Sequence, residues 1–234
     1  MILALDTSTD WCSLALYDPA GGVRAEQTWY AHRDQTAQLL PAVQHLLGQI
    51  KKTVDDVTSL AVALGPGSFT GLRVGLATAK GLAYARSLPL WGIPTLDILG
   101  YAHSAVTAAP VCAVLAAGRG RVAWALYRTQ HGRWQRLSEY QNTTIGELCG
   151  QIEQPTLFVG ELAAATGEIE TKLGRLASIA PAATSLRRAG FLAELAWQRA
   201  QQEEPDNPAT LQAIYLQMPT TGRPGRTPVA VSEP

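Results

Sequence analysis

The stretch from Ala61 to Gly75 (AVALGPGSFTGLRVG) constrains the fold of this chain more than any other. An apolar strand runs into a Gly-Pro-Gly turn, and Ser68 and Thr70 then begin a helix rich in Gly, Ala and Thr. Glycine permits positive φ and close approach of backbones, and Ser or Thr at a helix start caps free N–H groups. Because a helix start also binds anions, the turn is a candidate phosphate cradle. It is not a Walker loop, because no Gly-Lys-Ser/Thr follows it.

The composition is that of a globular, charge-balanced chain. Its 234 residues, 47% of them hydrophobic and 16% charged, suffice for one large domain or two small ones. A formal net charge of zero gives no global attraction to nucleic acid or to a membrane. The N-terminus lacks the basic region of a signal peptide, and no apolar run nears the ~18 residues that span a bilayer. We therefore expect a cytoplasmic protein with no membrane partner.

The order of strands and helices predicts an α/β unit with a mixed sheet in the first part of the chain. Three strands joined by tight turns form a meander, and an amphipathic helix, a strand, the glycine-rich helix and an edge strand follow. The expected strands are 2–5, 11–17, 23–30, 60–64 and 89–94, and the expected helices are 36–50 and 70–86.

A second unit repeats this order without repeating the sequence. After a connecting helix at 95–104, we expect strands at 111–115, 122–127, 134–140 and 156–159, and helices at 143–152, 162–173 and 185–201. The predicted domains are a first lobe over 1–102 that binds a partner, a smaller second lobe over 103–218, and a disordered tail over 219–234.

A second candidate phosphate loop lies between the first two strands. Its residues, Asp6-Thr7-Ser8, could present hydroxyl and N–H groups to a phosphate while Asp6 holds a cation through water. The loop contains no glycine, so an Asx or Ser/Thr turn that satisfies its own backbone is the competing interpretation. The possible phosphate or nucleotide residues are Asp6, Thr7, Ser8, Gly65, Gly67 and Ser68.

The helix after Gly67 lacks bulky side chains along one face. Gly71 and Gly75 lie four residues apart, and Ala79 continues the face. An internal glycine lowers helix stability by roughly 1 kcal/mol relative to alanine, so close packing must offset the loss. The packed surface could belong to the chain's own sheet, to another subunit or to a ligand. Arg73 and Lys80 lie on another face and could be turned to a partner or to a phosphate.

Other chemistries find little support in the residue patterns. The histidines have no metal-ligand spacing, and no Gly-x-Ser-x-Gly elbow occurs, so we predict no metal site and no catalytic residue. The three cysteines are far apart and form no Cys-x-x-Cys pair, so we expect small buried residues in a reducing compartment. They are Cys12, Cys112 and Cys149.

An arginine-rich stretch in the second unit has two interpretations. Five arginines occur without an acidic residue among them and are interleaved with three aromatic residues, which suits a nucleic-acid backbone. Because strand alternation would send these side chains to more than one side, a solvated hairpin face is the other interpretation. The residues are Arg119, Arg121, Arg128, Arg133 and Arg136, with Trp124, Tyr127 and Trp134.

These segments together resemble the TsaB (YeaZ) family. The resemblance is carried by ILALDTS at 2–8, QLLP at 38–41, LGPGSFTGLRVG at 64–75 and AKGLA at 79–83, and AIYL at 213–216 is similar to the family's closing strand. It implies a two-lobed fold of the actin-like ATPase class (ASKHA), in which each lobe resembles RNase H and mixed sheets are flanked by helices. The motifs are concentrated in residues 1 to about 100 of the chain.

The resemblance also implies a function in tRNA modification. TsaB-like proteins bind the catalytic subunit TsaD, a paralogue, and recruit the ATPase TsaE. That complex transfers threonylcarbamoyl to the adenosine beside the anticodon of tRNAs that read codons beginning with A (ANN). For this chain it implies a scaffold subunit without a cofactor of its own, with ATP and metal in the partner subunits. It would reach tRNA through the complex and could form a homodimer.

The partner face implied for this chain is formed by helices 36–50 and 70–86. Its predicted residues are Leu39, Val43, Gly71, Arg73, Gly75, Ala79 and Lys80. The alternatives to a scaffold are a nucleotide-dependent small-molecule kinase of the actin-like fold, and a peptidase. Two places depart from the family pattern: Gln35 stands where His is usual, and Ala116-Ala117-Gly118 replaces an Asp-Ala-Arg strand end.

Overall fold

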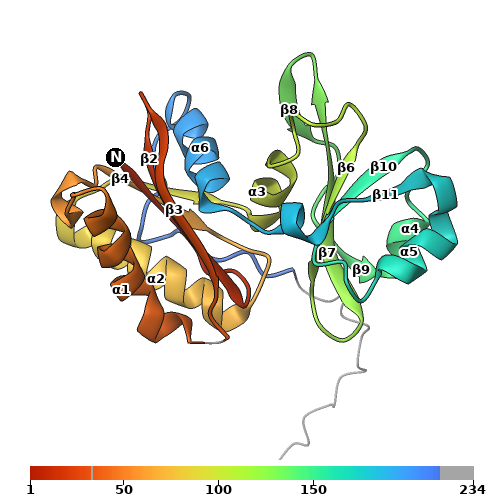
Figure 1. Ribbon diagram of the computed structural model, residues 1–234, viewed down its shortest axis with the longest axis horizontal. Helices are drawn as coiled ribbons and strands as arrows, with labels where there is room; N and C mark the ends of the chain where they lie inside the picture. Colours follow the sequence, from red (N-terminus) through yellow and green to blue (C-terminus); the bar gives the residue numbers. More distant parts are fainter. Residues whose placement is uncertain (33, 217–234) are drawn as a thin grey trace, which may run out of the picture.

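The structure, a computed structural model, describes residues 1–32 and 34–216, which form two α/β lobes side by side (Figure 1). The sheet of the first lobe has the strand order β3-β2-β1-β4-β5, in which β3, β2 and β1 are antiparallel and β4 and β5 run parallel to β1. Its elements are β1 (Ile2–Asp6), β2 (Trp11–Asp18), β3 (Gly22–Tyr30), α1 (Gln35–Gln49), the short 3₁₀ helix η1 (Val54–Asp56), β4 (Ser59–Ala63), α2 (Phe69–Arg86) and β5 (Leu90–Ile93).

The two faces of this sheet are covered by different helices (Figure 1). Alternate residues of a strand point to opposite faces. Leu3 and Leu5 of β1 accordingly pack in the core beneath α1 and α2. Ile2 and Ala4 pack in a second core, against α6 (Ala189–Ala200). The nearly continuous apolar sequence of β1 follows from burial on both faces.

Helix α6 lies on the first lobe, although it comes from the far end of the chain. The buried face of α6 is made of small and branched side chains. Beyond the helix, Asp206 also lies on this lobe, because its backbone N–H donates to the Leu90 carbonyl of β5. The prediction placed the first lobe in residues 1–102 and the second in 103–218. In the structure, α6 (Ala189–Ala200) comes from the second range but packs on the sheet of the first lobe. The face-forming residues of α6 are Ala189, Leu192, Ala193 and Ala196.

The second lobe repeats the strand order of the first. Its sheet runs β11-β10-β6-β7-β8, with β6, β7 and β8 antiparallel and β10 and β11 parallel to β6, while β9 pairs with β7. Helix α3 covers the face toward the first lobe, and α4 and α5 cover the other (Figure 1). The elements are α3 (Thr95–Tyr101), β6 (Val111–Ala116), β7 (Arg121–Gln130), β8 (Arg133–Arg136), β9 (Gln141–Thr144), α4 (Ile145–Cys149), β10 (Thr156–Gly160), α5 (Thr166–Leu173), η2 (Gly174–Leu176), β11 (Ala177–Ile179) and η3 (Ala182–Ser185).

Element boundaries in the second lobe differ from the prediction. Helix α5 begins four residues later than expected, because 162–165 form a turn in which Leu162 accepts the Ala165 and Thr166 N–H groups. The short strands β9 and β11 were not predicted, since neither has the alternation that marks a half-buried strand. The predicted tail at 219–234 lies outside the described residues.

The three cysteines are free and buried, as predicted. Burial is the main cause that raises the pKa of Cys12 to about 12, and the nearby Asp6 carboxylate adds to the effect. None of the helices that the structure describes is both long and apolar enough to cross a membrane.

Leu192→Ala tests whether α6 holds the first lobe together. Leu192 is fully buried against the sheet, so we expect the free energy of unfolding to fall by about 2–5 kcal/mol. Leu137→Ala is the matched control, because Leu137 is 42% exposed and its loss should change stability by no more than about 0.5 kcal/mol. Urea unfolding followed by circular dichroism measures both, and equal effects of the two variants would contradict the packing described.

Candidate functional site

The start of α2 lies in direct contact with the loop between β1 and β2. A Cβ atom added to Gly67 would lie 2.1 Å from the Ser8 carbonyl oxygen, and one added to Gly71 would lie 2.1 Å from the Thr7 carbonyl oxygen. At Gly75 the added atom would meet the Thr7 hydroxyl at 2.3 Å. The glycines are therefore required for close packing, and the packed surface is the chain's own first loop.

Hydrogen bonds close this contact. The Thr7 hydroxyl donates to the Gly71 carbonyl at 2.6 Å, and the Ser68 N–H donates to the Ser8 carbonyl at 2.6 Å. The Ser68 hydroxyl caps α2 by accepting the Gly71 N–H. Groups that a phosphate would need are thus already paired within the protein, and Thr7 and Ser8 are buried.

Asp6 is paired with an arginine instead of being open to a cation. One carboxylate oxygen accepts the Ser8 N–H at 2.9 Å and the Ser8 hydroxyl, and the other lies 3.1 Å from Nε of Arg187. The side chains of Asp6 and Arg187 are 1% and 4% exposed. A buried charge is stable only when it is paired and hydrogen-bonded, so the guanidinium supplies the positive charge that a hydrated cation would otherwise bring.

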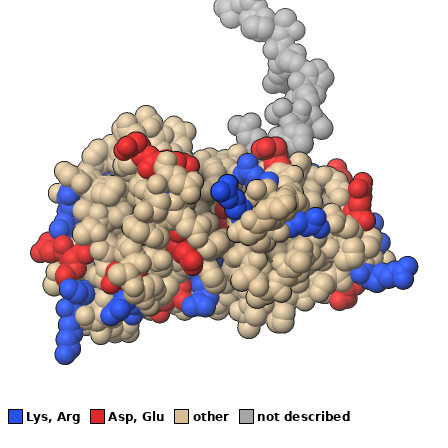
Figure 2. All heavy atoms as spheres, turned by 90° about the horizontal axis from the view of Figure 1, so that it is seen from above, with Lys and Arg blue, Asp and Glu red and all other residues tan. Residues whose placement is uncertain are grey.

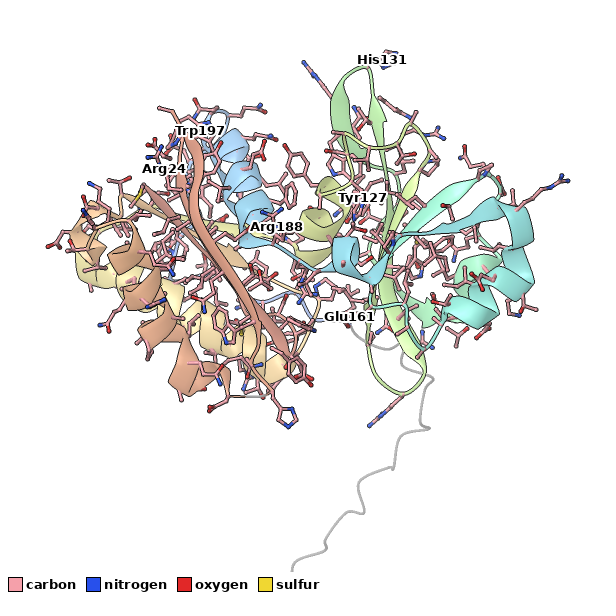
Figure 3. The ribbon with its side chains drawn as sticks, viewed as in Figure 1. Arg24, Tyr127, His131, Glu161, Arg188 and Trp197 are labelled. Atoms are coloured by element: carbon pink, nitrogen blue, oxygen red, sulfur yellow. The ribbon has the colours of Figure 1, made fainter. Side chains whose placement is uncertain are left out.

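Arg187 also joins the two lobes. It precedes α6, donates to the Thr9 hydroxyl, and lies 3.5 Å from the carboxylate of Glu161, which follows β10 in the second lobe. Glu161 lies at the junction of the lobes (Figure 3). Its other oxygen accepts the Ala116 N–H at 3.1 Å, so the strand end that departs from the family pattern is tied to the same network.

A cleft of about 490 Å³ opens beside this network. Of the predicted phosphate residues, it is lined by Gly67 and Ser68 but not by Asp6, Thr7, Ser8 or Gly65. Gly65 is set back by a positive φ of 99°, and its N–H donates to the Thr95 hydroxyl. The full lining is Thr9, Asp10, Trp11, Tyr30, Gly67, Ser68, Ala116, Ala117, Gly118 and Glu161.

The charges of the cleft do not favour a phosphate. Its charged lining residues are the acids Asp10 and Glu161, and like charge repels an anion. The Ser68 hydroxyl accepts the Gly71 N–H as the cap of α2. The acidic lining and the helix-capping role of Ser68 do not favour the phosphate interpretation of this turn.

Five of the seven residues predicted for the partner face lie inside the first lobe. Leu39, Val43 and Ala79 pack in its core, and Gly71 and Gly75 face the loop between β1 and β2. The apolar stripe of each helix is turned to the lobe's own sheet, although Val43 also lines a groove between α1, α2 and η1. Arg73 is exposed with its guanidinium 3.7 Å from the Phe69 ring centroid, and Lys80 is half-buried.

Two residues of the network escaped the sequence analysis. Arg187 and Glu161 belong to the second half of the chain and contact Asp6 or its neighbours only through the fold, and the sequence offers no pairing signal for them. Gln35, at the position that departs from the family pattern, is also part of the site: it is buried and donates to the Thr9 carbonyl at 3.2 Å.

Within the described ranges, no three His, Cys, Asp or Glu side chains gather to hold a metal ion.

Comparisons with known proteins identify the family. A family model described as TsaD, tRNA N6-adenosine threonylcarbamoyltransferase, matches residues 13–219. The chain is 31% identical over 162 residues to the tRNA threonylcarbamoyladenosine biosynthesis protein TsaB of Bacillus subtilis (strain 168), covering 68% of this chain and 70% of that protein. The chain belongs to the TsaB family. The TsaB of Escherichia coli (strain K12) is 40% identical over 135 residues, or 57% of this chain and 58% of that protein, so this match spans less than two thirds of that relative.

Solved structures confirm the TsaB (YeaZ) resemblance and the expected fold. YeaZ from Pseudomonas aeruginosa has a TM-score of 0.77 and 27% identity, covering 92% of this chain and 99% of that one. An activator of 2-hydroxyisocaproyl-CoA dehydratase from Clostridium difficile with bound ADPNP has a TM-score of 0.51 at 10% identity, over 86% of this chain and 96% of that one, and shows the fold alone. The TsaB-family chain therefore has the two-lobed α/β fold of the actin-like class.

Two alanine substitutions in α2 should have opposite effects on stability. Gly71→Ala places Cβ against the Thr7 backbone, so we expect a loss of about 1–3 kcal/mol from overpacking. Gly81→Ala meets no atom within 4 Å and should gain about 1 kcal/mol of helix stability. Chemical denaturation compares the two variants, and a stabilising Gly71→Ala would refute the close contact.

Neighbouring arginines give a matched test of the buried pair. Arg187→Ala leaves the Asp6 carboxylate buried without its cation, and we expect the free energy of unfolding to fall by about 3–5 kcal/mol. Arg188→Ala breaks a pair with Glu26, in which Arg188 is 56% exposed, and a contact with the Phe191 ring, and should lose no more than about 1 kcal/mol. The double variant Asp6→Asn/Arg187→Met should recover part of the loss, and thermal unfolding that ranks Arg188→Ala as the more harmful would contradict this account.

Proposed function

We propose that this chain is a non-catalytic scaffold subunit of the complex that transfers threonylcarbamoyl to the adenosine beside the anticodon of tRNAs reading ANN codons. It would bind and activate a TsaD-like catalytic subunit in the cytoplasm, and a TsaE-like ATPase would join the complex. The names of the relatives, which place them in tRNA threonylcarbamoyladenosine biosynthesis, support the reaction. Asp6 is paired with Arg187, and the start of α2 packs directly against the loop between β1 and β2. Both observations support a role without nucleotide chemistry in this subunit.

The observation that carries the proposal is the outer face of α2. Five exposed residues recur at spacings of three and four, so they lie along one side of the helix. In the middle of this stripe, Ala77 carries only a methyl group and Gly81 no side chain, and a Cβ added to Gly81 would have no described atom within 4 Å. We call these two positions the notch. Packing among the described residues does not explain this glycine. The stripe consists of Thr70, Arg73, Ala77, Gly81 and Tyr84.

Exposed apolar side chains occur both on the stripe and on the neighbouring helix α1. Leu40 of α1 is 51% exposed and Tyr84 of α2 is 61% exposed. A groove of about 480 Å³ runs between the two helices and the η1 segment, and its lining includes Leu40, Val54 and Leu82. Exposed apolar side chains next to a notch of small residues favour the close approach of a partner helix. The same face could support a homodimer when the TsaD-like subunit is absent.

Gly81→Leu tests this face without disturbing the core. The added side chain would fill the notch, so we expect the affinity for a TsaD-like subunit to fall at least tenfold in a titration by calorimetry. Gly167→Leu is the matched control, because Gly167 is an exposed helical glycine of the second lobe that also has open space around it. Thermal unfolding of both variants checks that the fold is retained.

The proposal also predicts a biochemical outcome. The wild-type chain should restore threonylcarbamoyl modification of tRNA in an extract depleted of its TsaB-family protein, and Gly81→Leu should restore less. Absence of binding to the TsaD-like subunit, together with an unrestored extract, would overturn the scaffold function.

A further inference from the structure

A cavity between the two lobes, on the side of the β7–β8 hairpin, is not used by the proposed function. It has a volume of about 880 Å³, within the range of small-ligand sites. The hairpin, the segment after α3, and α6 form its walls (Figure 1). The lining residues are Tyr101, Ser104, Ala105, Thr129, Gly132, Arg133, Trp134, Leu195, Gln198 and Gln202.

Trp134 gives the cavity an aromatic wall. Its ring lies parallel to the buried ring of Tyr127, with 5.3 Å between centroids and 4° between planes. The Tyr101 ring meets Trp134 edge-on at 6.5 Å, and a Cβ at Gly100 would lie 3.0 Å from the Trp134 ring. The ring is thus held in place by packing, and its half-buried remaining surface lines the cavity.

The arginine-rich stretch divides into paired and unpaired members. Arg121 donates to Asn142, Arg128 donates to Gln154, and Arg136 lies over the Tyr140 ring and pairs with Glu139. The Arg133 guanidinium, at the cavity, has no hydrogen bond or ion pair among the residues that the structure describes. Trp124 and Tyr127 are buried, so Arg133 and Trp134 are the neighbouring pair that this stretch presents to the cavity.

The remaining polar groups suit a nucleobase. Gln198 donates to the Tyr101 hydroxyl at 2.7 Å, which leaves its carbonyl oxygen available, and Gln202 makes no side-chain hydrogen bond among the described residues. Amide groups can donate to and accept from base edges. No carboxylate of the residues that the structure describes lines the cavity. Glu194, on the neighbouring surface, accepts a hydrogen bond from the Tyr101 hydroxyl.

We propose that this cavity binds one unpaired nucleotide of the tRNA substrate, with the base stacked on Trp134 and its phosphate contacting Arg133. The inference rests on the proposed function, which brings RNA to the complex. A single unpaired guanidinium matches the single phosphate of an RNA nucleotide better than the several phosphates of a free nucleoside di- or triphosphate.

The surface charge predicts weak, local binding. Figure 2 views the molecule from the side of the hairpin, and basic and acidic side chains are interspersed there among wide uncharged areas. Such a surface provides no strong field for the RNA backbone. The cavity would therefore position a nucleotide that the complex has already recruited.

The test uses the full chain and a fluorescently labelled RNA hairpin made of an anticodon stem and loop. Anisotropy at low ionic strength should show binding to the hairpin and none to a blunt duplex of the same stem. Trp134→Leu should weaken binding about tenfold through the lost stacking. Arg133→Gln should weaken it and reduce the slope of log affinity against log salt by about 1. Gln202→Glu, at an exposed position, should weaken binding without affecting the fold, which thermal unfolding verifies.

Arg24→Gln is the matched control for charge. Arg24 is exposed on β3 of the first lobe, far from the hairpin (Figure 3), so RNA binding should be unchanged. Equal losses for Arg24→Gln and Arg133→Gln would overturn the proposal, as would absence of hairpin binding or its displacement by equimolar AMP. Calorimetry with the TsaD-like subunit separates the two proposals. If the chain binds that subunit but Arg133→Gln and Trp134→Leu leave RNA binding unchanged, the nucleotide site is rejected and the scaffold function stands.

Discussion

The close approach of α2 to the loop between β1 and β2 is the constraint on which the rest of the structure depends. Gly67 and Gly71 bring helix backbone against loop carbonyls, and the Thr7 hydroxyl then bonds to the helix. This contact sets the position of α2 over the sheet and so decides which of its faces is turned outward. One face without side chains packs inside the chain, and a second, around Gly81, is open to the surroundings. The two sets of glycines in one helix therefore serve different contacts.

The buried Asp6–Arg187 pair determines which charge faces the end of the first strand. A carboxylate at the end of the first strand is suited to hold a hydrated cation near a phosphate, but here a guanidinium fixed by the protein neutralises it. Because Arg187 also reaches Glu161, the neutralising charge is shared with the second lobe. The same residue thus removes a requirement of nucleotide binding and adds a contact between lobes. Both effects are compatible with the scaffold role that we propose.

Much of the first lobe could be predicted from the sequence, because its signals are local. The tight turns between the first strands fix a meander, and the apolar spacing from Leu39 to Leu47 fixes a helix on one face of the sheet. The site could be predicted only in part. The glycine-rich turn was recognised, but its contact partner was not, and Arg187 meets Asp6 across 181 residues of sequence. Predictions of the partner face selected residues by helical periodicity, which marks the buried face of a helix, so mostly core residues were chosen.

The return of α6 to the first sheet has a consequence for how the protein is made. During synthesis the first five strands, α1 and α2 emerge early, but the helix that covers Ile2, Ala4 and Ala15 emerges only after the whole second sheet. Domains tend to fold from the N-terminus as the chain appears. Here one apolar face of the first sheet stays uncovered until the second sheet has been synthesised, and Arg187, which shortly precedes α6, reaches Asp6 at the same stage. The lobe that begins first is therefore completed last.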